Sequence, residues 1–240
     1  GFVGEMRYGL INRRHVLDEA ALPRMVERFA QLAELPGQPL RRPMTDPRLT
    51  STRQQQNATL KALEMARPVR AVVFCPGAEY GPAKRWPAAH FAALANKLGR
   101  RGFTVWLLGS GKDREIGEEI VRLSSAATPP KNLCGTTNLT QAIDLIAMAS
   151  FVVCNDSGLM HVAAAVGSKI IALYGSSSPT FTPPLSPTAK VVRLGLSCSP
   201  CFKRECPLGH LDCLVKIDPQ TVLDACLKAI DPTLTPEPVA

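Results

Sequence analysis

The 240-residue sequence predicts an α/β protein in which helices cover both faces of a parallel, doubly wound sheet. Two observations carry this prediction. From Val69 onward, short apolar runs alternate with helix-like segments of about 10–15 residues. Glycines and small polar residues directly follow two of these runs, as they do at the carboxyl ends of parallel strands, where ligands bind. The apolar fraction of 45% and the charged fraction of 20% are ordinary for a globular protein.

The apolar runs and the periodic segments place each element of this sheet. The predicted strands are residues 71–75, 103–108, 132–134, 151–154, 169–174 and 191–194. The predicted helices are residues 87–100, 113–123, 140–149, 158–166 and 219–230. Pro87 is well tolerated in the first turn of its helix, and Thr140 and Asp218 are the expected N-caps of two others.

The first 68 residues are less regular. Residues 17–35 show apolar positions at helical spacing, residues 37–49 are rich in proline and arginine, and residues 52–65 suit one more helix. We therefore expect three parts: residues 1–36 as the tail of one domain, residues 37–68 as a linker, and residues 69–240 as the sheet domain. The first residues lack the plan of a signal peptide, and we expect the chain to be an internal piece of a longer protein.

The net charge of +8 favours an anionic partner. The basic residues are scattered, and the sequence contains no long basic run and no RNA-binding motif, which argues against nucleic acid. No apolar run approaches the roughly 18 residues that span a bilayer. An anionic small molecule or a glycolipid fits this charge best.

The loop after the first predicted strand combines glycines and prolines with Lys84. Glycine allows the backbone to approach a ligand closely, and a lysine meets a phosphate as a point charge. The alternative is a surface lysine beside a turn. The sequence leaves both interpretations open.

The segment after the fourth predicted strand reads Asn-Asp-Ser-Gly-Leu-Met-His over residues 155–161. Asp156 ends the strand, and Ser157 and Gly158 open a helix whose free N–H groups suit a diphosphate. His161 lies about one helical turn after Ser157 on the same face. The alternative is that Asp156 and Ser157 only cap the helix while His161 packs.

Two further loops give weaker signals. Residues 109–113 (GSGKD) suit a ribose or a base, with Asp113 accepting a hydroxyl hydrogen bond, or only start a helix. Residues 174–179 (YGSSSP) suit the sugar end of a pocket or only a turn. The sequence has neither a full G-x-G-x-x-G nor a G-x-x-x-x-G-K-[ST] motif, which disfavours a dinucleotide oxidoreductase and a P-loop nucleotidase.

The eight cysteines fall into two groups. Four lie in apolar patterns and are expected in the core: Cys75, Cys134, Cys154 and Cys226. The other four cluster near His210: Cys198, Cys201, Cys206 and Cys213. Thiolates at short spacing suit a structural zinc ion, and the alternatives are free thiols, disulfides or an iron–sulfur cluster. The gaps match no standard zinc finger or ferredoxin pattern.

Three segments resemble the lipopolysaccharide heptosyltransferases of glycosyltransferase family 9. They are residues 76–87 (PGAEYGPAKRWP), 155–161 (NDSGLMH) and 173–179 (LYGSSSP). Residues 4–12 and 181–185 favour the type II branch over type I. The resemblance covers nearly the whole chain. It implies the GT-B arrangement, in which two Rossmann-like domains face each other, the N-terminal one holding a glycolipid acceptor and the C-terminal one an ADP-sugar donor.

The resemblance also implies roles for individual residues. Lys84 is implied to contact phosphate and Asp156 to lie near the donor sugar, as the catalytic residues of this chain. The implied donor-binding residues are Thr137, Ser157, Gly158, Leu159 and His161. The family's general base is expected outside this sequence, so the chain is expected to bind donor and to be inactive alone.

The implied reaction is an inverting transfer of L-glycero-D-manno-heptose from ADP-heptose to the lipid A–Kdo–heptose acceptor, without a cofactor or catalytic metal. The implied location is the cytoplasm, with peripheral contact at the inner face of the inner membrane. One alternative is a non-catalytic nucleotide- or zinc-binding module, which predicts little ADP affinity and stoichiometric zinc. Another is a nucleotide-sugar epimerase, which predicts binding of a hexosamine nucleotide.

Overall fold

The computed structural model describes residues 1–4, 6–7 and 9–231; residues 5, 8 and 232–240 lie outside this description, including Glu5 and Tyr8 of the family-like segment 4–12. The contacts divide the chain into two compact units. Unit 1 is Gly1–Asp46 with Ser178–Pro183, and unit 2 is Pro47–Ser177 with Pro184–Ala240. The three-part division drawn from the sequence, with a linker at residues 37–68, stays a prediction.

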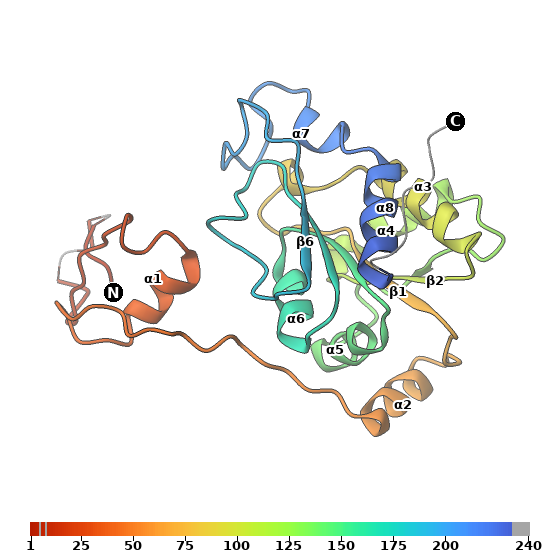
Figure 1. Cartoon of the computed structure of the whole chain (residues 1–240), viewed down its shortest axis with the longest axis horizontal. Coiled ribbons are helices and arrows are strands. Elements are labelled where there is room, and N and C mark those ends of the chain that lie inside the picture. Colours follow the sequence, from red (N-terminus) through yellow and green to blue (C-terminus); the bar gives the residue numbers. More distant parts are fainter. Residues whose placement is uncertain (5, 8, 232–240) are drawn as a thin grey trace. The chain divides into compact units, whose positions relative to one another are not determined.

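Unit 2 contains a six-stranded, fully parallel sheet with the strand order β3-β2-β1-β4-β5-β6 (Figure 1). The strands are β1 (Ala71–Cys75), β2 (Thr104–Leu107), β3 (Lys131–Asn132), β4 (Val152–Asn155), β5 (Ile170–Leu173) and β6 (Ala189–Val192). This sheet confirms the predicted α/β fold. The order reverses between β1 and β4, which pair in the register Val73–Val152, and such a reversal leaves a crevice at the carboxyl ends of the two strands.

Helices cover both faces of the sheet, and successive strand residues alternate between two apolar clusters. The first cluster joins Val72 and Phe74 to helices α3 (Ala88–Gly99), α4 (Arg114–Leu123) and α8 (Pro219–Ile230). The second joins Val73 and Cys75 to helices α2 (Arg53–Ala62), α5 (Leu139–Met148) and α6 (Gly158–Val166). Because both faces are covered, the central strands β1, β4 and β5 are buried along their whole length, which made them readable from the sequence; the outer strands β3 and β6 each carry an exposed lysine.

Three short helices complete the description. The 3₁₀ turns η1 (Pro82–Lys84) and η2 (Gly111–Asp113) lie in the loops after β1 and β2, and α7 (Asp212–Val215) contains the last of the four clustered cysteines.

Two helices differ from the sequence expectation. The N-cap of α5 is Asn138, whose side chain accepts a hydrogen bond from the Gln141 amide at 2.9 Å, so the predicted cap at Thr140 is wrong. In unit 1 the helix α1 spans only Met25–Gln31 within the predicted segment 17–35. Pro23 explains the late start, because proline lacks an N–H group and its ring clashes with a preceding helical turn.

Helix α2 is held against α5 by a buried carboxylate. Asp144 accepts hydrogen bonds from the hydroxyls of Ser51 at 2.6 Å and Thr59 at 2.7 Å. A polar group in the interior needs such partners, because leaving it unpaired costs about 1–3 kcal/mol. Part of the segment expected to be a linker is therefore built into unit 2.

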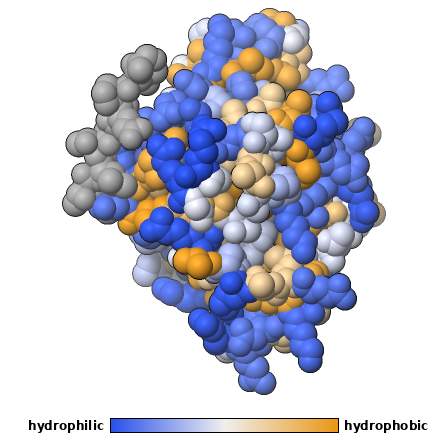
Figure 2. Space-filling view, turned by 90° about the vertical axis from the view of Figure 1, so that its right-hand side faces the viewer, coloured by the Kyte–Doolittle hydropathy of each residue, from blue (hydrophilic) through white to orange (hydrophobic). Residues whose placement is uncertain are grey.

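Hydrophilic residues and smaller hydrophobic areas are interspersed over the face shown in Figure 2. Within the described residues, no helix is both long enough and apolar enough to cross a membrane.

Candidate functional site

The loops after β1 and β4 meet at the point where the strand order reverses. The buried side chain of Asn155 joins them: its amide donates to the Pro76 carbonyl at 2.7 Å, and its amide oxygen accepts from the Trp86 backbone N–H at 3.1 Å. Trp86 is itself fully buried and donates its indole N–H to the Ile217 carbonyl at 3.0 Å. Trp86 thus packs in the core, and Asn155 fixes both ends of the loop that carries Lys84.

Lys84 and Asp156 form an ion pair across these two loops. The distance between Lys84 Nζ and Asp156 Oδ2 is 2.6 Å, and the side chains are 16% and 4% exposed. The sequence predicted both residues for the site, and the structure brings them into direct contact. The nearly buried Asp156 carboxylate fixes the position of the Lys84 ammonium group. Lys84 is therefore held at the edge of the sheet where the loops after β1 and β4 meet.

Helix α6 begins directly after Asp156. Ser157 occupies its N-cap position but makes no side-chain capping hydrogen bond, so the alternative of a simple serine cap does not describe this helix start. Ser157, Gly158 and Leu159 all line the adjoining pocket. The partial positive charge at a helix N-terminus, together with Lys84 beside it, makes this end of the pocket favourable for an anion.

His161 follows in the first turn of α6 and is exposed at the surface. The protein around the imidazole still removes enough water to lower the pKa of His161; Asp156 raises this pKa and Lys84 lowers it further. The imidazole therefore lies within electrostatic reach of the Lys84–Asp156 pair. Because its pKa is below the ordinary value, it is mainly neutral at pH 7 and can either donate or accept a hydrogen bond.

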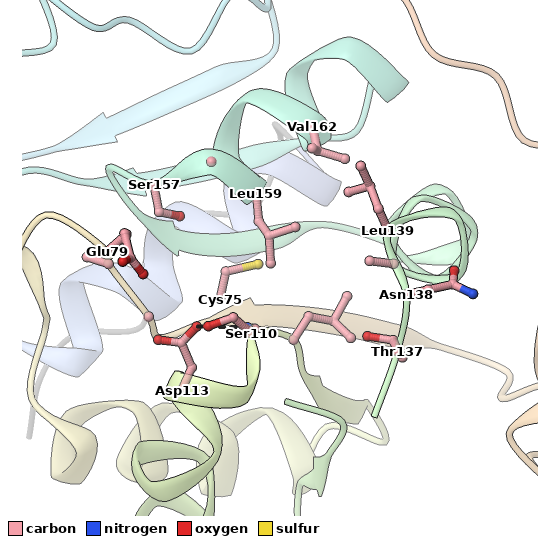
Figure 3. Close-up of a pocket in the computed structure, with 16 residues that line it drawn as sticks. Cys75, Glu79, Ser110, Asp113, Thr137, Asn138, Leu139, Ser157, Leu159 and Val162 are labelled. Atoms are coloured by element: carbon pink, nitrogen blue, oxygen red, sulfur yellow. Dashed lines mark hydrogen bonds between the residues drawn. The ribbon is translucent and has the colours of Figure 1, made fainter. Parts of the chain in front are cut away.

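A pocket of about 460 Å³ opens beside the start of α6, within the range typical of small-molecule sites. Glu79, Asp113 and Ser157 lie toward one end in Figure 3, and Leu139 and Val162 lie toward the other. The predicted residue Thr137 lies on the wall at this second end. The pocket thus has a polar end beside α6 and a more apolar end beside α5, an arrangement suited to a nucleotide.

Asp113 has a local role in this wall. One of its carboxylate oxygens accepts hydrogen bonds from both the backbone N–H and the hydroxyl of Ser110, each at 2.8 Å. A Cβ placed on Gly77 or Gly109 would overlap the Asp113 side chain as it lies in the structure. The Asp113 side chain therefore fills the space between its own loop and the loop after β1.

Ser176 and Ser177 lie after β5, in the loop for which the sequence suggested either the sugar end of a pocket or a turn. Both are buried, and their hydroxyl oxygens have no hydrogen-bond partner among the described residues. Neither residue lines the pocket beside α6. Buried hydroxyls of this kind are available to a ligand or to water.

The four cysteines predicted for the core are all buried. Burial raises the pKa of Cys134 to about 12 and raises the pKa of the Cys75 thiol, which lines the pocket. These thiols are neutral at physiological pH and serve as small packing residues.

The zinc site at the four clustered cysteines stays a prediction. Over the described part of the chain, no three His, Cys, Asp or Glu side chains come together in a way that could hold a metal ion. Cys213 is buried within the first apolar cluster. Cys206 instead receives backbone N–H groups, first that of Leu211 and then those of residues 208–210, which lower its pKa. All four cysteines are free in this structure, and burial, followed by the nearby Cys198, Cys201 and Cys206, raises the pKa of Cys213.

Sequence reasoning missed the role of Asn155 and the pocket residues Glu79 and Ala142. A signal for Asn155 was present, because an amide closing an apolar strand just before the Asp-Ser-Gly turn must be buried and needs partners. No signal was available for Ala142, whose place in the wall depends on how α5 packs.

Comparison with known proteins gives a consistent picture. The family model described as glycosyltransferase family 9 (heptosyltransferase) matches residues 1–212. Lipopolysaccharide heptosyltransferase 2 of Escherichia coli K12 is 45% identical over 231 residues, which cover 93% of this chain and 66% of the relative. Lipooligosaccharide heptosyltransferase 2 of Haemophilus influenzae is 46% identical over 209 residues, covering 81% of this chain and 58% of the relative.

The structural comparison agrees. The solved structure of E. coli ADP-heptose LPS heptosyltransferase II superposes with a TM-score of 0.85 at 43% identity, covering 96% of this chain and 69% of that one. A family 9 glycosyltransferase from Veillonella parvula gives a TM-score of 0.62 at 28% identity, covering 74% and 51%. The chain spans about two thirds or less of the length of the first two curated relatives above.

Proposed function

The chain belongs to glycosyltransferase family 9, the heptosyltransferase family, and from this premise we propose that unit 2 binds an ADP-sugar donor. We propose further that the protein to which the chain corresponds transfers L-glycero-D-manno-heptose from ADP-heptose to the inner core of lipopolysaccharide. The observation that carries the proposal is the Lys84–Asp156 pair at the N-terminus of α6, beside a pocket of nucleotide size.

The two ends of the pocket suit the two parts of ADP. Thr137 and Leu139 line the end suited to the adenine, and Ser157 and Gly158 line the end suited to the diphosphate. In this pose the backbone N–H groups at the start of α6 and the Lys84 ammonium group face the diphosphate, as the resemblance implies. Leu159 forms the wall between the two ends.

Glycosyl transfer develops positive charge on the sugar and negative charge on the departing diphosphate. Lys84 and the N-terminus of α6 are already positioned for that negative charge, and such preorganised groups lower the barrier most effectively. Asp156 holds Lys84 and adds a negative charge near the sugar. We propose an inverting displacement in which these groups stabilise the leaving diphosphate, without a requirement for a divalent metal.

Acceptor deprotonation is assigned, by the same family resemblance, to an acidic residue outside this sequence. The proposed acceptor is the lipid-linked inner core, lipid A–Kdo–heptose. Contact with the cytoplasmic face of the inner membrane is accordingly proposed as peripheral. The 240-residue chain by itself is proposed to bind donor without transferring heptose.

Calorimetric titration of the chain with ADP and with UDP tests the donor site. We expect saturable binding that prefers ADP, and a loss of at least about tenfold in affinity in Lys84→Ala, because a charge-assisted contact contributes about 1.5–3 kcal/mol. Lys169→Ala, at an exposed lysine before β5, is the matched control and should bind as wild type. Equal or tighter binding of UDP would favour the epimerase alternative, and absence of binding would contradict the proposal.

A further inference from the structure

The cysteine-rich segment (residues 198–213) is attached to the loop after β5. Its Ser199 hydroxyl donates a hydrogen bond to the Gly175 carbonyl, and its Phe202 backbone N–H donates to the Ser176 carbonyl at 2.7 Å. Gly175 also leaves room for the segment's neighbour Leu214, because an added Cβ would lie 2.5 Å from the Leu214 side chain. The segment is thus fixed to the same edge of the sheet that carries the donor pocket.

The same segment also holds the loop that carries Lys84. The Tyr80 hydroxyl donates to the Phe202 carbonyl at 2.8 Å, and the Ala83 backbone N–H donates to the Arg204 carbonyl at 3.0 Å. These contacts connect residues more than 100 positions apart in the sequence. The loop after β1 is therefore supported from outside by the cysteine-rich segment, and from inside by Asn155.

Gly81 lies at the closest approach between the two segments. A Cβ at this position would lie 2.4 Å from the Arg204 carbonyl oxygen and 3.0 Å from its carbonyl carbon. These are backbone atoms, which cannot turn away as the end of a side chain can. The φ angle of Gly81 is 160°, an extended conformation open to any residue, so the close approach and not the backbone conformation requires glycine here.

Tyr80 connects this contact to the ammonium group of Lys84. Lys84 Nζ lies 5.1 Å from the centre of the Tyr80 ring, within the range of a cation–π contact, and the Arg204 guanidinium lies over the same ring at 5.5 Å. The ammonium group is thus located by Asp156 and by the Tyr80 ring. Tyr80 is in turn located by the Phe202 carbonyl.

We propose that Tyr80 and Gly81 are positioning residues for the donor site, which lock the loop after β1 onto the cysteine-rich segment and so place Lys84 for the diphosphate. The inference rests on the proposed function of Lys84. It gives the cysteine-rich segment a role as the outer support of the phosphate-binding loop.

A double-mutant cycle on ADP affinity tests this inference. Calorimetry compares the wild-type chain, Gly81→Ala, Lys84→Ala and the double variant. We expect Gly81→Ala to weaken ADP binding about tenfold in the wild-type background and to have no further effect once Lys84 is absent, because the lock acts through Lys84. General damage to the fold would weaken binding in both backgrounds.

Two further variants complete the design. Tyr80→Phe is the milder change, because it removes the hydrogen bond to Phe202 but keeps the ring beside Lys84. We expect the ADP affinity to fall about threefold, and to be unaffected by this change when Lys84 is absent. It serves as the test if Gly81→Ala does not fold. Gly99→Ala, at the end of α3 with only an ordinary contact at 3.4 Å, should bind ADP as the wild type does.

The inference is overturned if Gly81→Ala and Tyr80→Phe leave the affinity unchanged, or if their effects add fully to that of Lys84→Ala. These outcomes require a wild-type chain that binds ADP through Lys84. A wild-type chain without ADP affinity would instead overturn the proposed function, and the inference with it.

Discussion

The two units of the chain are stabilised by different kinds of buried polar group. Unit 2 surrounds a parallel sheet with two apolar clusters, and its buried amide Asn155 and carboxylate Asp144 bond to backbone groups and hydroxyls. Within the described residues of unit 1, Leu22 is the one buried apolar side chain, and the buried carboxylate of Glu27 bonds to arginines. The fold of unit 2 therefore depends on apolar burial and shape, whereas the fold of unit 1 depends on charge.

Asn155→Ala should have the largest effect on unit 2. The substitution leaves the buried Trp86 N–H and the Pro76 carbonyl without their partner, and we expect the free energy of unfolding to fall by about 3 kcal/mol. Denaturant titration followed by circular dichroism measures it. A loss below about 1 kcal/mol would show that water replaces the amide, and that apolar packing alone holds the two loops.

Acidification should affect unit 1 next. Burial alone raises the pKa of Glu27, but hydrogen bonds from Arg24 and Arg42 outweigh it and lower the pKa to about 2 from 4.5. Because the folded-state pKa is depressed, the stabilisation is fully present above pH 4.5 and is lost as the pH falls toward 2. It amounts to about 2–3 kcal/mol at most.

Hydrogen exchange of the α1 amides between pH 5 and pH 2.5 measures this loss, after correction for the intrinsic pH dependence of exchange. Glu27→Gln is the matched control, because it keeps the shape of the side chain and cannot titrate. The variant should be weaker at pH 5 and should not lose further protection on acidification. If amide exchange had the same pH dependence in the wild-type chain and in Glu27→Gln, titration of Glu27 would not be the cause of the lost protection.

The exposed pair Lys112–Glu79 should have the smallest effect, although its atoms are only 2.5 Å apart. Both side chains are about three-quarters exposed, so water and salt screen the attraction. We expect Lys112→Ala to leave the Tm of unit 2 unchanged within error in a thermal scan. A clear fall in Tm would mean that charge contributes to unit 2 as it does to unit 1.

The two units also differ in how much of their fold could be predicted from the sequence. In unit 2 the bounds of β1 and α6 were predicted without error, and the other strands deviate by one or two residues. The apolar runs there are buried on both faces, so hydrophobicity reports structure directly. In unit 1 the helical periodicity of residues 17–35 extends well beyond α1. In a partly exposed segment, apolar residues can occur at helical spacing without being buried, so their spacing is a weaker sign of a helix.

The site was predictable at the level of segments and not of contacts. Strand ends mark where Lys84 and Asp156 must lie, but their pairing depends on the path of a loop after β1 that only tertiary packing defines. The arrangement of the four clustered cysteines was not predictable, because cysteine spacing says nothing about where each sulfur points: Cys213 is buried in the first apolar cluster, and Cys206 meets backbone N–H groups. The support that this segment gives to Gly81 leaves no local pattern in the sequence.

A crystal structure of the chain with bound ADP tests the central claim most directly. The account predicts diphosphate oxygens within about 2.7–3.2 Å of Lys84 Nζ and of the backbone N–H groups that begin α6, with the adenine between Thr137 and Leu139. An ordered nucleotide whose diphosphate lies away from Lys84, or whose base occupies the polar end beside Glu79, would contradict it.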